Sequence, residues 1–384
     1  MIREFTRDTA RTWAEISLGN LEHNYRALRA CAPESKFLAT VKANAYGHGA
    51  VPVAKRLVEL GADYLAAACL SEARELRQTG IKAPILILGD TPPECARELV
   101  ELDITQTVFT PELAKALSDA AGAAGKRAKI HLKADTGMSR LGVLCREPEQ
   151  AAADIAALCA LPHLEPEGIF THFAVSDEEG EDSEAYTMLQ FTRFLDVLEQ
   201  LKSAHGLEFE IRHCANSGAV LNYPCTHLDM VRPGIALYGH YPDPSCEGLD
   251  GPGLRPVMSL YSRVAAVRGF PADTPVSYGR TAGFGDSGGR TAVLPIGYAD
   301  GLHRMLSNKG SVWLDGRFRP IMGRICMDMC MIGLDESANV RPGDVAEVFG
   351  EHLPVERHAQ TAGTISSELL CAVAPRVPRI YKDA

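Results

Sequence analysis

The sequence predicts an α/β protein in which an N-terminal (β/α)8 TIM-type barrel precedes a smaller, mainly β C-terminal domain. Short apolar runs alternate with amphipathic stretches over residues 12–240. A stretch rich in Pro and Gly follows at 241–256. Beyond it the helical period fades, and β-rich segments are separated by Gly, Pro and Asp turns. We therefore assign residues 12–240 to the barrel, and residues 251–384 together with 1–11 to the second domain.

Eight apolar runs account for the strands of the barrel. Each is short and is bounded by Gly, Asp, Pro or charged residues, as expected for a buried parallel strand. They lie at 37–41, 64–68, 85–88, 105–109, 128–132, 168–172, 210–213 and 230–236. An open doubly wound sheet is the alternative. It normally has fewer strands, and no G-x-G-x-x-G motif follows the first run.

The segments between these runs carry helical patterns, which a barrel of this type requires. The clearest lie at 51–61, 71–80, 92–102, 111–122 and 184–201. In the last of them the spacing predicts an apolar face made of Tyr186, Leu189, Phe194, Leu195 and Leu198.

The second domain is predicted from strand-like segments that follow the Pro- and Gly-rich stretch. They lie at 257–270, 290–299, 311–334 and 344–350. Near the start of the chain, residues 13–18 (WAEISL) also have the pattern of a strand. This strand is a candidate for pairing with the second domain.

Composition excludes several classes of protein. Hydrophobic residues make up 46% and charged residues 23% of the 384 positions, which excludes disorder, collagen-like repeats and coiled coil as the main content. The net charge of −10 disfavours nucleic acid and anionic membranes as partners. The start of the chain lacks the apolar region of a signal peptide, and no run is long enough to span a bilayer. With eleven scattered cysteines, the chain is expected to be a reduced, cytoplasmic protein.

Lys42 is the first candidate for chemistry, because it stands where the first barrel strand ends and a Gly-rich turn begins, in VKANAYGHG. Catalytic groups of barrels lie at the carboxyl ends of the strands. Partial desolvation there would favour the neutral amine, which can form a Schiff base. Considered alone, Lys42 is better explained as an ordinary lysine at a strand end.

Six further segments change that interpretation. They read HLKADTGMSRLG from His131, VRPGIALYG from Val231, SYGRTA from Ser277, LPIGYADG from Leu294, GRICMDM from Gly323 and RVPRIY from Arg376. Together with Lys42 they resemble alanine racemase of the fold-type III pyridoxal phosphate family, in the same order and over nearly the whole chain. The resemblance implies an isomerase that uses pyridoxal 5'-phosphate to interconvert L- and D-alanine, and that supplies D-alanine for peptidoglycan.

Racemisation requires a proton acceptor on one face of the substrate and a proton donor on the other. The resemblance assigns these two catalytic roles to Lys42 and Tyr278. It also implies that Tyr278 comes from the second subunit of a head-to-tail homodimer. A phenol with a pKa near 10 is a poor base at neutral pH, so it needs a nearby cation or hydrogen-bond partner. The resemblance nominates Arg140 and His172.

The resemblance further implies which residues bind the cofactor. Arg232 would face the pyridine nitrogen. A guanidinium does not readily give up a proton, so this nitrogen should stay unprotonated and transamination should be suppressed. Trace formation of pyruvate during turnover would measure this selectivity. The cofactor-binding set consists of Lys42, Tyr46, His172, Asn216, Ser217, Arg232, Gly234, Ile235 and Ser367.

Substrate and supporting residues are also implied by the resemblance. Arg140, the N–H of Met327 and Tyr298 would bind or admit the amino acid. Lys133 resembles a lysine that many members carry as a carbamate, which would hold Arg140. His213 would support Arg232. Asp328 would support residues that contact the substrate, without contacting it itself.

Ser367 departs from the family pattern. The family commonly has a tyrosine in a T-I-x-Y-E segment, whereas residues 364–368 read TISSE. That tyrosine binds phosphate and narrows the substrate pocket. We therefore hypothesise that this pocket admits a larger or more polar side chain, such as that of serine.

Other functions stay open at the level of sequence. A serine or broad-specificity amino-acid racemase is favoured by Ser367. A fold-type III decarboxylase would have an acidic residue at the pyridine nitrogen, which Arg232 argues against. A non-catalytic pyridoxal phosphate-binding protein would lack the β domain and Tyr278. Histidines at strand ends suggest a metal site only weakly, because no carboxylate or second histidine accompanies them at ligand spacing; no metal is expected.

Overall fold

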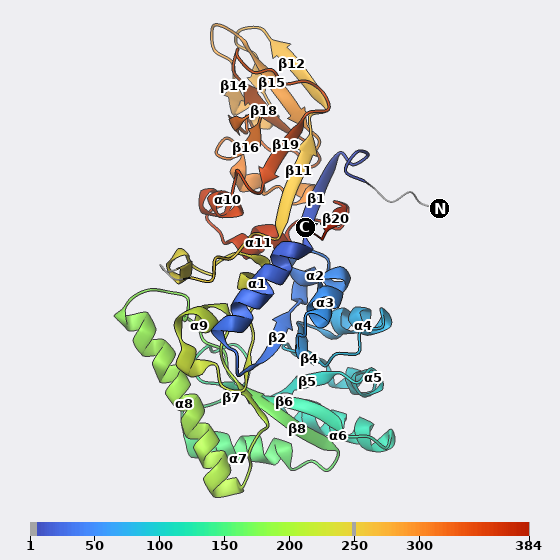
Figure 1. Ribbon diagram of the computed structural model, residues 1–384, viewed down its shortest axis with the longest axis vertical. Coiled ribbons are helices and arrows are strands. Elements are labelled where there is room, and N and C mark those ends of the chain that lie inside the picture. The colour runs from blue at the N-terminus through green and yellow to red at the C-terminus, as the bar shows by residue number, and fades with distance from the viewer. Residues whose placement is uncertain (1–5, 248–250, 384) are drawn as a thin grey trace. The chain divides into compact units, whose positions relative to one another are not determined.

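The computed structural model describes residues 6–247 and 251–383, and it divides the chain into two compact units. The barrel unit comprises Leu21–Ala45 and Ala50–Arg255. The β unit comprises Met1–Asn20, Tyr46–Gly49 and Pro256–Ala384. Figure 1 labels the elements of both. Of the expected linker at 241–256, residues 248–250 lie outside the described residues, as do residues 1–5 of the N-terminal segment.

The barrel unit contains a nearly closed parallel sheet of eight strands, as predicted, with a short extra strand at Val143–Leu144 (β7) beside β6. Hydrogen bonds from Asp229 N to Arg212 O (3.1 Å) and from Arg232 N to Ala215 O (2.9 Å) link the two ends of the sheet. The strands, in spatial order, are β10 (Met230–Val231), β2 (Lys36–Thr40), β3 (Tyr64–Ala67), β4 (Ile85–Ile87), β5 (Thr105–Val108), β6 (Ala128–Asp135), β8 (Leu164–Phe170) and β9 (Ile211–His213).

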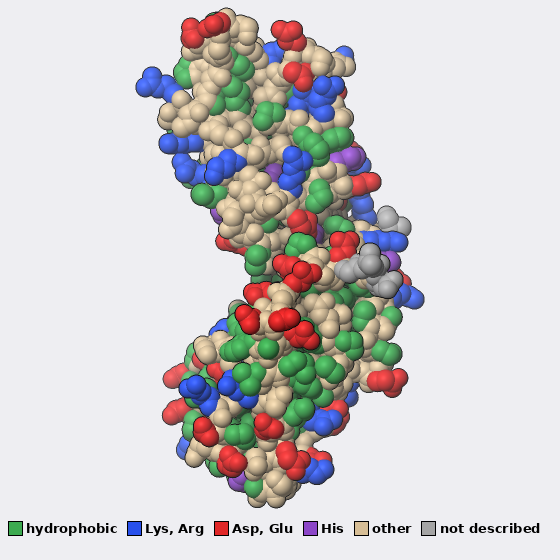
Figure 2. All heavy atoms as spheres, turned by 90° about the vertical axis from the view of Figure 1, so that its left-hand side faces the viewer, with side chains coloured by type: hydrophobic (Ala, Val, Ile, Leu, Met, Phe, Trp, Pro, Cys, Tyr) green, Lys and Arg blue, Asp and Glu red, His purple; other side chains and the backbone are tan. Residues whose placement is uncertain are grey.

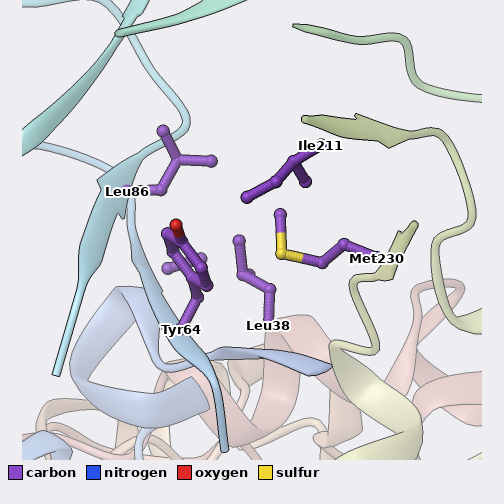
Figure 3. Close-up of a cluster of buried hydrophobic side chains, with 6 residues drawn as sticks. Leu38, Tyr64, Leu86, Ile211 and Met230 are labelled. Carbon is purple, nitrogen blue, oxygen red and sulfur yellow. The ribbon is translucent and has the colours of Figure 1, made fainter. Parts of the chain in front are cut away.

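The inside of the barrel is filled by apolar side chains. A buried cluster consists of Leu38, Tyr64, Ala66, Leu86, Ile211 and Met230. Figure 3 shows that the labelled members of this cluster come from separate strands and point toward one another. Burying one such large side chain contributes about 1.5–3 kcal/mol, so the cluster holds the strand ends in fixed positions.

Helices cover the outside of the barrel (Figure 1). α1 (Leu18–Cys31) contacts the barrel from Leu21 onward through buried apolar residues. The others are α3 (Ala50–Glu59), α4 (Leu70–Gln78), α5 (Ala96–Glu101), α6 (Pro111–Ala123), α7 (Pro148–Cys159), α8 (Glu181–His205) and α9 (Ser217–Asn222). On the face drawn in Figure 2, acidic and basic side chains are interspersed over the barrel.

The predicted apolar face of α8 is wrong. Tyr186, Leu189 and Leu195 are exposed, whereas Phe194 is buried. The inner face instead includes the polar Gln190, whose Oε1 accepts from Ala174 N (2.9 Å) and whose Nε2 donates to His172 O (3.1 Å). The apolar part of the buried face consists of Phe191, Phe194, Val197 and Leu201, and Gln190 beside them satisfies backbone groups of the loop after β8.

The β unit is built around a six-stranded sheet in the order β17, β16, β19, β11, β1, β20. Its strands are β1 (Thr12–Ser17), β11 (Met258–Arg263), β16 (Ser311–Leu314), β17 (Arg317–Pro320), β19 (Val345–Phe349) and β20 (Arg379–Lys382). A second sheet contains β12 (Ala266–Phe270), β15 (Gly289–Leu294) and β18 (Cys330–Leu334), and β13 (Pro275–Val276) pairs with β14 (Ala282–Gly283). Helices α10 (Val355–Ala362) and α11 (Ser366–Cys371) complete the unit.

Residues 12–20 belong to the β unit, which differs from the boundary expected at residue 12. β1 pairs antiparallel with β11 and parallel with β20. Trp13 and Ile16 are fully buried there, and the Trp13 ring stacks on Tyr261 at 5.6 Å. The strand near the start of the chain is thereby held between β11 and β20, the last strand of the chain.

In the residues that the structure describes, no helix is long and apolar enough to cross a membrane. The same search of the described part of the chain finds no group of three or more His, Cys, Asp or Glu side chains that could hold a metal ion.

Candidate active site

Lys42 lies directly beyond β2, at the carboxyl end of the barrel. It begins the turn α2 (Lys42–Tyr46), in which Ala43, Asn44 and Ala45 have φ values of 52°, 54° and 54°. Tyr46 follows with a φ of 52°. Left-handed backbone costs an L-residue roughly 1–2 kcal/mol, so four successive examples need support.

Three hydrogen bonds hold this turn. Ala45 N donates to Val41 O (2.8 Å), and Ala50 N donates to the Asn44 side chain (2.8 Å). Glu72, which the sequence analysis did not single out, accepts from Ala43 N (2.7 Å) and from Ala68 N (2.8 Å). A carboxylate in the first turn of α4 thereby fixes the backbone beside Lys42, a role that no local pattern reveals.

Arg232 follows β10, the strand that neighbours β2, and both Arg232 and Lys42 lie close enough to His172 to lower its pKa. Thr40 N donates to Pro233 O (3.4 Å), which joins the two strand ends. The guanidinium is 4% exposed and donates only to neutral acceptors. These are His213 Nδ1 (3.0 Å), Thr171 O (2.8 Å), Cys214 O (3.0 Å) and His172 Nδ1 (3.3 Å). Burial lowers the pKa of Arg232 to about 10, which leaves it charged at neutral pH.

Lys133 brings a second cationic group to the same place. Its Nζ lies 4.3 Å from the centre of the Phe170 ring, and the Arg232 guanidinium lies 5.2 Å from it. The His213 ring stacks on the same phenyl ring at 4.7 Å. Burial, reinforced by Arg232 and Arg140, holds the pKa of Lys133 well below its usual range.

Lys133 and Arg232 are both buried, and neither forms an ion pair with any described residue. Buried charge is normally compensated by a partner of opposite sign. The donor set at the carboxyl end of the barrel therefore fits an anionic ligand, and pyridoxal 5'-phosphate has this character.

Ser217 supplies a hydroxyl next to these cations. Its Oγ accepts from Gly234 N (2.8 Å) and from Ala236 N (3.3 Å), which leaves the hydroxyl proton available for donation to a ligand. The structure thus brings Ser217 and Gly234 together, with Ile235 between the two amides. Asn216 has a capping role: its Oδ1 accepts from Ala219 N (3.0 Å) and from the Ser176 hydroxyl (2.8 Å).

Three histidines of the barrel unit, the buried His131 and His213 and the partly buried His172, have pKa values below the ordinary one. Burial is the largest cause of their lowered pKa values, and the charge of Arg232 adds to it. In the unfolded chain they would charge below about pH 6.5. Each group therefore contributes stability that is present above that pH and is lost as the pH falls below it.

We expect this difference to appear as proton uptake on unfolding. At about pH 5.5, His131→Gln should take up about one proton fewer than the native chain when it unfolds, measured by calorimetry in buffers of different ionisation enthalpy. His205 at the end of α8 is exposed, so His205→Gln should leave the uptake unchanged. Equal uptake by the native chain and His131→Gln would contradict a buried neutral His131.

The remaining predicted site residues belong to the β unit. Tyr278 is 69% exposed at a turn in which Ser277, Gly279 and Arg280 have positive φ. Ser277 Oγ donates to Arg324 O (2.5 Å) and so ties this turn to the segment that contains Met327. Gly279 has a φ of 73°, a left-handed conformation that strains any other residue, so the turn favours glycine there.

Met327, Tyr298 and Asp328 lie together in this unit. Ala299 N donates to Met327 O (3.0 Å) and Tyr298 N donates to Cys326 O (3.1 Å). Asp328 accepts from Arg376 (2.8 Å), which also donates to the buried Asp300 (2.8 Å). Asp328 therefore anchors the Met327 segment to the end of the chain.

Tyr46 and Ser367 are also brought together by the β unit. A Cβ on Gly47 would lie 2.2 Å from Leu370 O, so the segment after Tyr46 packs directly on α11. Burial, with a contribution from Cys371, raises the pKa of the Tyr46 phenol. Ser367 precedes Cys371 by one turn on the same face of α11.

A (β/α)8 barrel with an amine and buried basic side chains at its carboxyl end, joined to a β domain that carries an exposed tyrosine, is typical of a two-domain barrel enzyme. The alanine racemase N-terminal domain matches residues 16–242, and the alanine racemase C-terminal domain matches residues 257–381. The chain belongs to the alanine racemase family.

Individual relatives agree over the full length. An alanine racemase of Desulforamulus reducens is 46% identical over 373 residues, 96% of this chain and 98% of the relative. The crystal structure of alanine racemase from the D-cycloserine producer Streptomyces lavendulae matches with a TM-score of 0.91 at 40% identity, over 98% of each chain. The Bacillus anthracis alanine racemase with bound L-Ala-P matches with a TM-score of 0.90 at 35% identity, over 99% of this chain and 96% of that one.

Proposed function

We propose that this protein is a pyridoxal 5'-phosphate-dependent alanine racemase that interconverts L- and D-alanine. The observation that carries the proposal is that Lys42 and Arg232 follow neighbouring strands of the barrel and that both lie close enough to His172 to lower its pKa, in a family whose curated members are named alanine racemase. An amine that can form a Schiff base and a buried guanidinium thereby lie at the same end of the barrel.

The residues that would hold the cofactor come from both units. In the barrel, Lys42 would bind its aldehyde carbon, the Ser217 hydroxyl would donate to its phosphate, and Arg232 would donate to its ring nitrogen. In the β unit, Tyr46 and Ser367 would donate to the phosphate. When bound, the cofactor supplies a conjugated system that delocalises the negative charge left after the α-proton departs.

The two protein bases would work in turn. With the substrate in place, the Lys42 amine would accept or return the α-proton on one side, and the Tyr278 hydroxyl would do so on the other. Arg140 and the Met327 N–H would bind the substrate carboxylate, and Tyr298 would line the route by which it enters. His172 would support the proton transfer of Tyr278.

The proposed assembly is a head-to-tail homodimer in which each subunit contributes Tyr278 to its partner's barrel. The exposure of Tyr278 supports this, because 69% of a large aromatic side chain is left in solvent in the single chain. Met327 in the neighbouring segment is also 53% exposed. Shared sites of this kind require a closed two-fold assembly.

We further propose that Lys133 carries a carbamate. Burial holds the pKa of its amine well below the usual range, which favours loss of the ammonium proton, and the amine is the form that adds to carbon dioxide; the N–C bond forms and one proton leaves. The resulting anion would compensate Arg232 and hold Arg140. A carbamate signal in the 13C NMR spectrum of the native enzyme after equilibration with labelled bicarbonate is the expected result, and Lys133→Gln should lack it. A native enzyme without the signal, or an equal signal in Lys133→Gln, would contradict the assignment.

The direct test of the function is the loss of optical rotation for a panel of L-amino acids, with and without added pyridoxal 5'-phosphate. We expect rapid loss with alanine and none without the cofactor. Release of carbon dioxide would instead indicate a decarboxylase. Cofactor binding without any racemisation would indicate a binding protein.

A serine or broad-specificity racemase is the second candidate, because Ser367 replaces a phenol ring by a hydroxymethyl group. We expect measurable kcat/KM with serine, and we expect Ser367→Tyr to lower it while alanine turnover is retained. A difference of one methylene group in a pocket changes discrimination in kcat/KM by about 10- to 200-fold. We therefore expect Ser367→Tyr to lower the ratio of kcat/KM for serine to that for alanine by about 10-fold or more. Ser366→Tyr, one position earlier on α11, is the matched control. Negligible serine turnover in the native enzyme and in Ser367→Tyr alike would refute the idea.

In the cell, the proposed role is to supply D-alanine for peptidoglycan, acting in the cytoplasm. The net charge of −10 and the absence of a membrane-spanning helix from the described residues are compatible with this role. Growth of a strain that lacks its own racemase, in medium without D-alanine, is the test.

A further inference from the structure

We propose that His131 and Glu167 are positioning residues for Arg232. Through His213 they form a buried chain of hydrogen bonds that runs in one direction from the guanidinium to the carboxylate. The chain itself is a property of the barrel, and only its effect on the cofactor rests on the proposed function.

Four groups from four strand segments make up the chain. Arg232 NH1 donates to His213 Nδ1 at 3.0 Å. His213 Nε2 lies 2.8 Å from His131 Nδ1. His131 Nε2 lies 3.3 Å from Glu167 Oε2. Both histidines and the guanidinium are buried, so no water competes for these bonds.

The direction of the chain follows from counting protons. A guanidinium can only donate, so His213 Nδ1 must accept and its proton must be on Nε2. That proton is donated to His131 Nδ1, which leaves the proton of His131 on Nε2, facing Glu167. An ionised carboxylate can only accept. One arrangement of protons therefore satisfies every bond, and both imidazoles are neutral in it.

Glu167 is held as the carboxylate that the chain requires. Burial opposes its ionisation, but hydrogen bonds from His131 and Lys129 outweigh burial and lower its pKa to about 2. Lys129 Nζ donates to Glu167 Oε1 at 2.9 Å. The Tyr64 hydroxyl also forms a hydrogen bond with Glu167. Glu167 thereby places negative charge at the far end of the chain from Arg232.

The backbone makes room for this chain. A Cβ on Gly168 would lie 2.5–2.8 Å from three ring atoms of His131, so any side chain there would displace the imidazole. The pairing of β6 with β8 shifts register between Ile130 and His131, which aims the ring at Glu167 and His213. The Phe170 ring then stacks on His213 at 4.7 Å and restricts its rotation.

The consequence is a guanidinium with a fixed orientation. Thr171 O, Cys214 O and His172 hold NH2, and the chain holds NH1. If Arg232 is to keep a ring nitrogen unprotonated, it must present an N–H bond and not rotate away. Without its hydrogen bond to His131, the His213 ring could rotate, and Arg232 NH1 would then lose its acceptor.

The test compares three variants of the full-length enzyme. His131→Gln keeps an acceptor toward His213 and a donor toward Glu167. His131→Leu keeps neither. His205→Gln changes an exposed histidine of α8 and serves as the control. Nitrogen NMR of 15N-histidine-labelled protein without cofactor reports the proton positions on His131 and His213. Nitrogen NMR of 15N-labelled pyridoxal 5'-phosphate bound to the enzyme reports protonation of its ring.

In the native protein at pH 7, both histidines should carry their proton on Nε2 only. In His131→Leu the ring nitrogen of the bound cofactor should become partly protonated, and kcat should fall about 10- to 100-fold with KM nearly unchanged. His131→Gln should restore the unprotonated ring and kcat to within about 3-fold. The control should match the native enzyme in every measurement.

Two results would overturn the inference. One is a proton on Nδ1 of either histidine, or a charged imidazole, in the native protein without cofactor. The other is a folded His131→Leu enzyme whose ring-nitrogen signal and kcat match those of the native enzyme. Failure of the cofactor to bind at all would instead refute the proposed function. The histidine measurement would still decide whether the hydrogen bonds from Arg232 to Glu167 form as proposed.

Discussion

Lys42→Ala should lose the visible absorbance of the bound cofactor and lower racemisation by about 10⁴-fold. The substitution removes the only amine at the end of β2, so the cofactor would have no Schiff-base partner there and one face of the substrate would have no base. Absorbance of the purified enzyme and the rate of change of optical rotation with L-alanine are the measurements.

Lys36→Ala is the matched control, because Lys36 lies at the opposite end of the same strand. Its ammonium is 3.6 Å from Glu210 and its side chain is 42% exposed, so the ion pair is worth less than about 1 kcal/mol. We expect this variant to retain colour and turnover. Native-like turnover by Lys42→Ala would remove the basis of the proposed function.

Tyr278→Phe, which removes one oxygen atom, should lower racemisation by about 10²- to 10⁴-fold in both directions. Lys42 would still act on its own face of the substrate. Exchange of the α-proton with solvent deuterium should therefore persist for one enantiomer of alanine and be lost for the other. Mass spectrometry of each recovered enantiomer measures this exchange.

Tyr261→Phe is the control within the same unit, since Tyr261 stacks on Trp13 in the main sheet. It should retain racemisation and exchange with both enantiomers. Retained exchange with both enantiomers in Tyr278→Phe would show that another group supplies the second base.

Mixing the Lys42→Ala and Tyr278→Phe subunits tests the proposed dimer. If each site takes Lys42 from one subunit and Tyr278 from the other, a mixed dimer contains one intact site, and part of the activity should return. If both residues act within one chain, every site in the mixture keeps a defect and no activity should return.

The barrel could be predicted because its signals are local. Each buried strand is a short apolar run closed by a Gly, Pro, Asp or charged residue, and the eight observed strands overlap the eight predicted runs. Lys42 could be nominated for the same reason, since its place at the end of a strand is visible in neighbouring residues. The functional roles of Tyr278, Arg232 and Ser217 required resemblance to a family, because no local pattern states them.

Other features depend on contacts between distant segments. Residues 13–18 have a strand pattern, but only the pairing with β11 and β20 assigns them to the β unit. The predicted face of α8 differs from the buried one, which contains Phe191, Phe194 and Val197 and also the polar Gln190, whose partners are backbone groups of a loop after another strand. Hydrophobic spacing carries no information about such partners.

By itself, the sequence determined the order of strands and helices, the division into a barrel and a β domain, and the candidate lysine. The tertiary structure alone decided that Glu72 supports the left-handed turn beside Lys42, and that His131 and Glu167 stand behind Arg232. The physical reason is that a hydrogen bond needs two groups within about 3 Å. Strand register, a missing Cβ at Gly168 and the stacked Phe170 ring set those positions, and each of them depends on residues far apart in the chain.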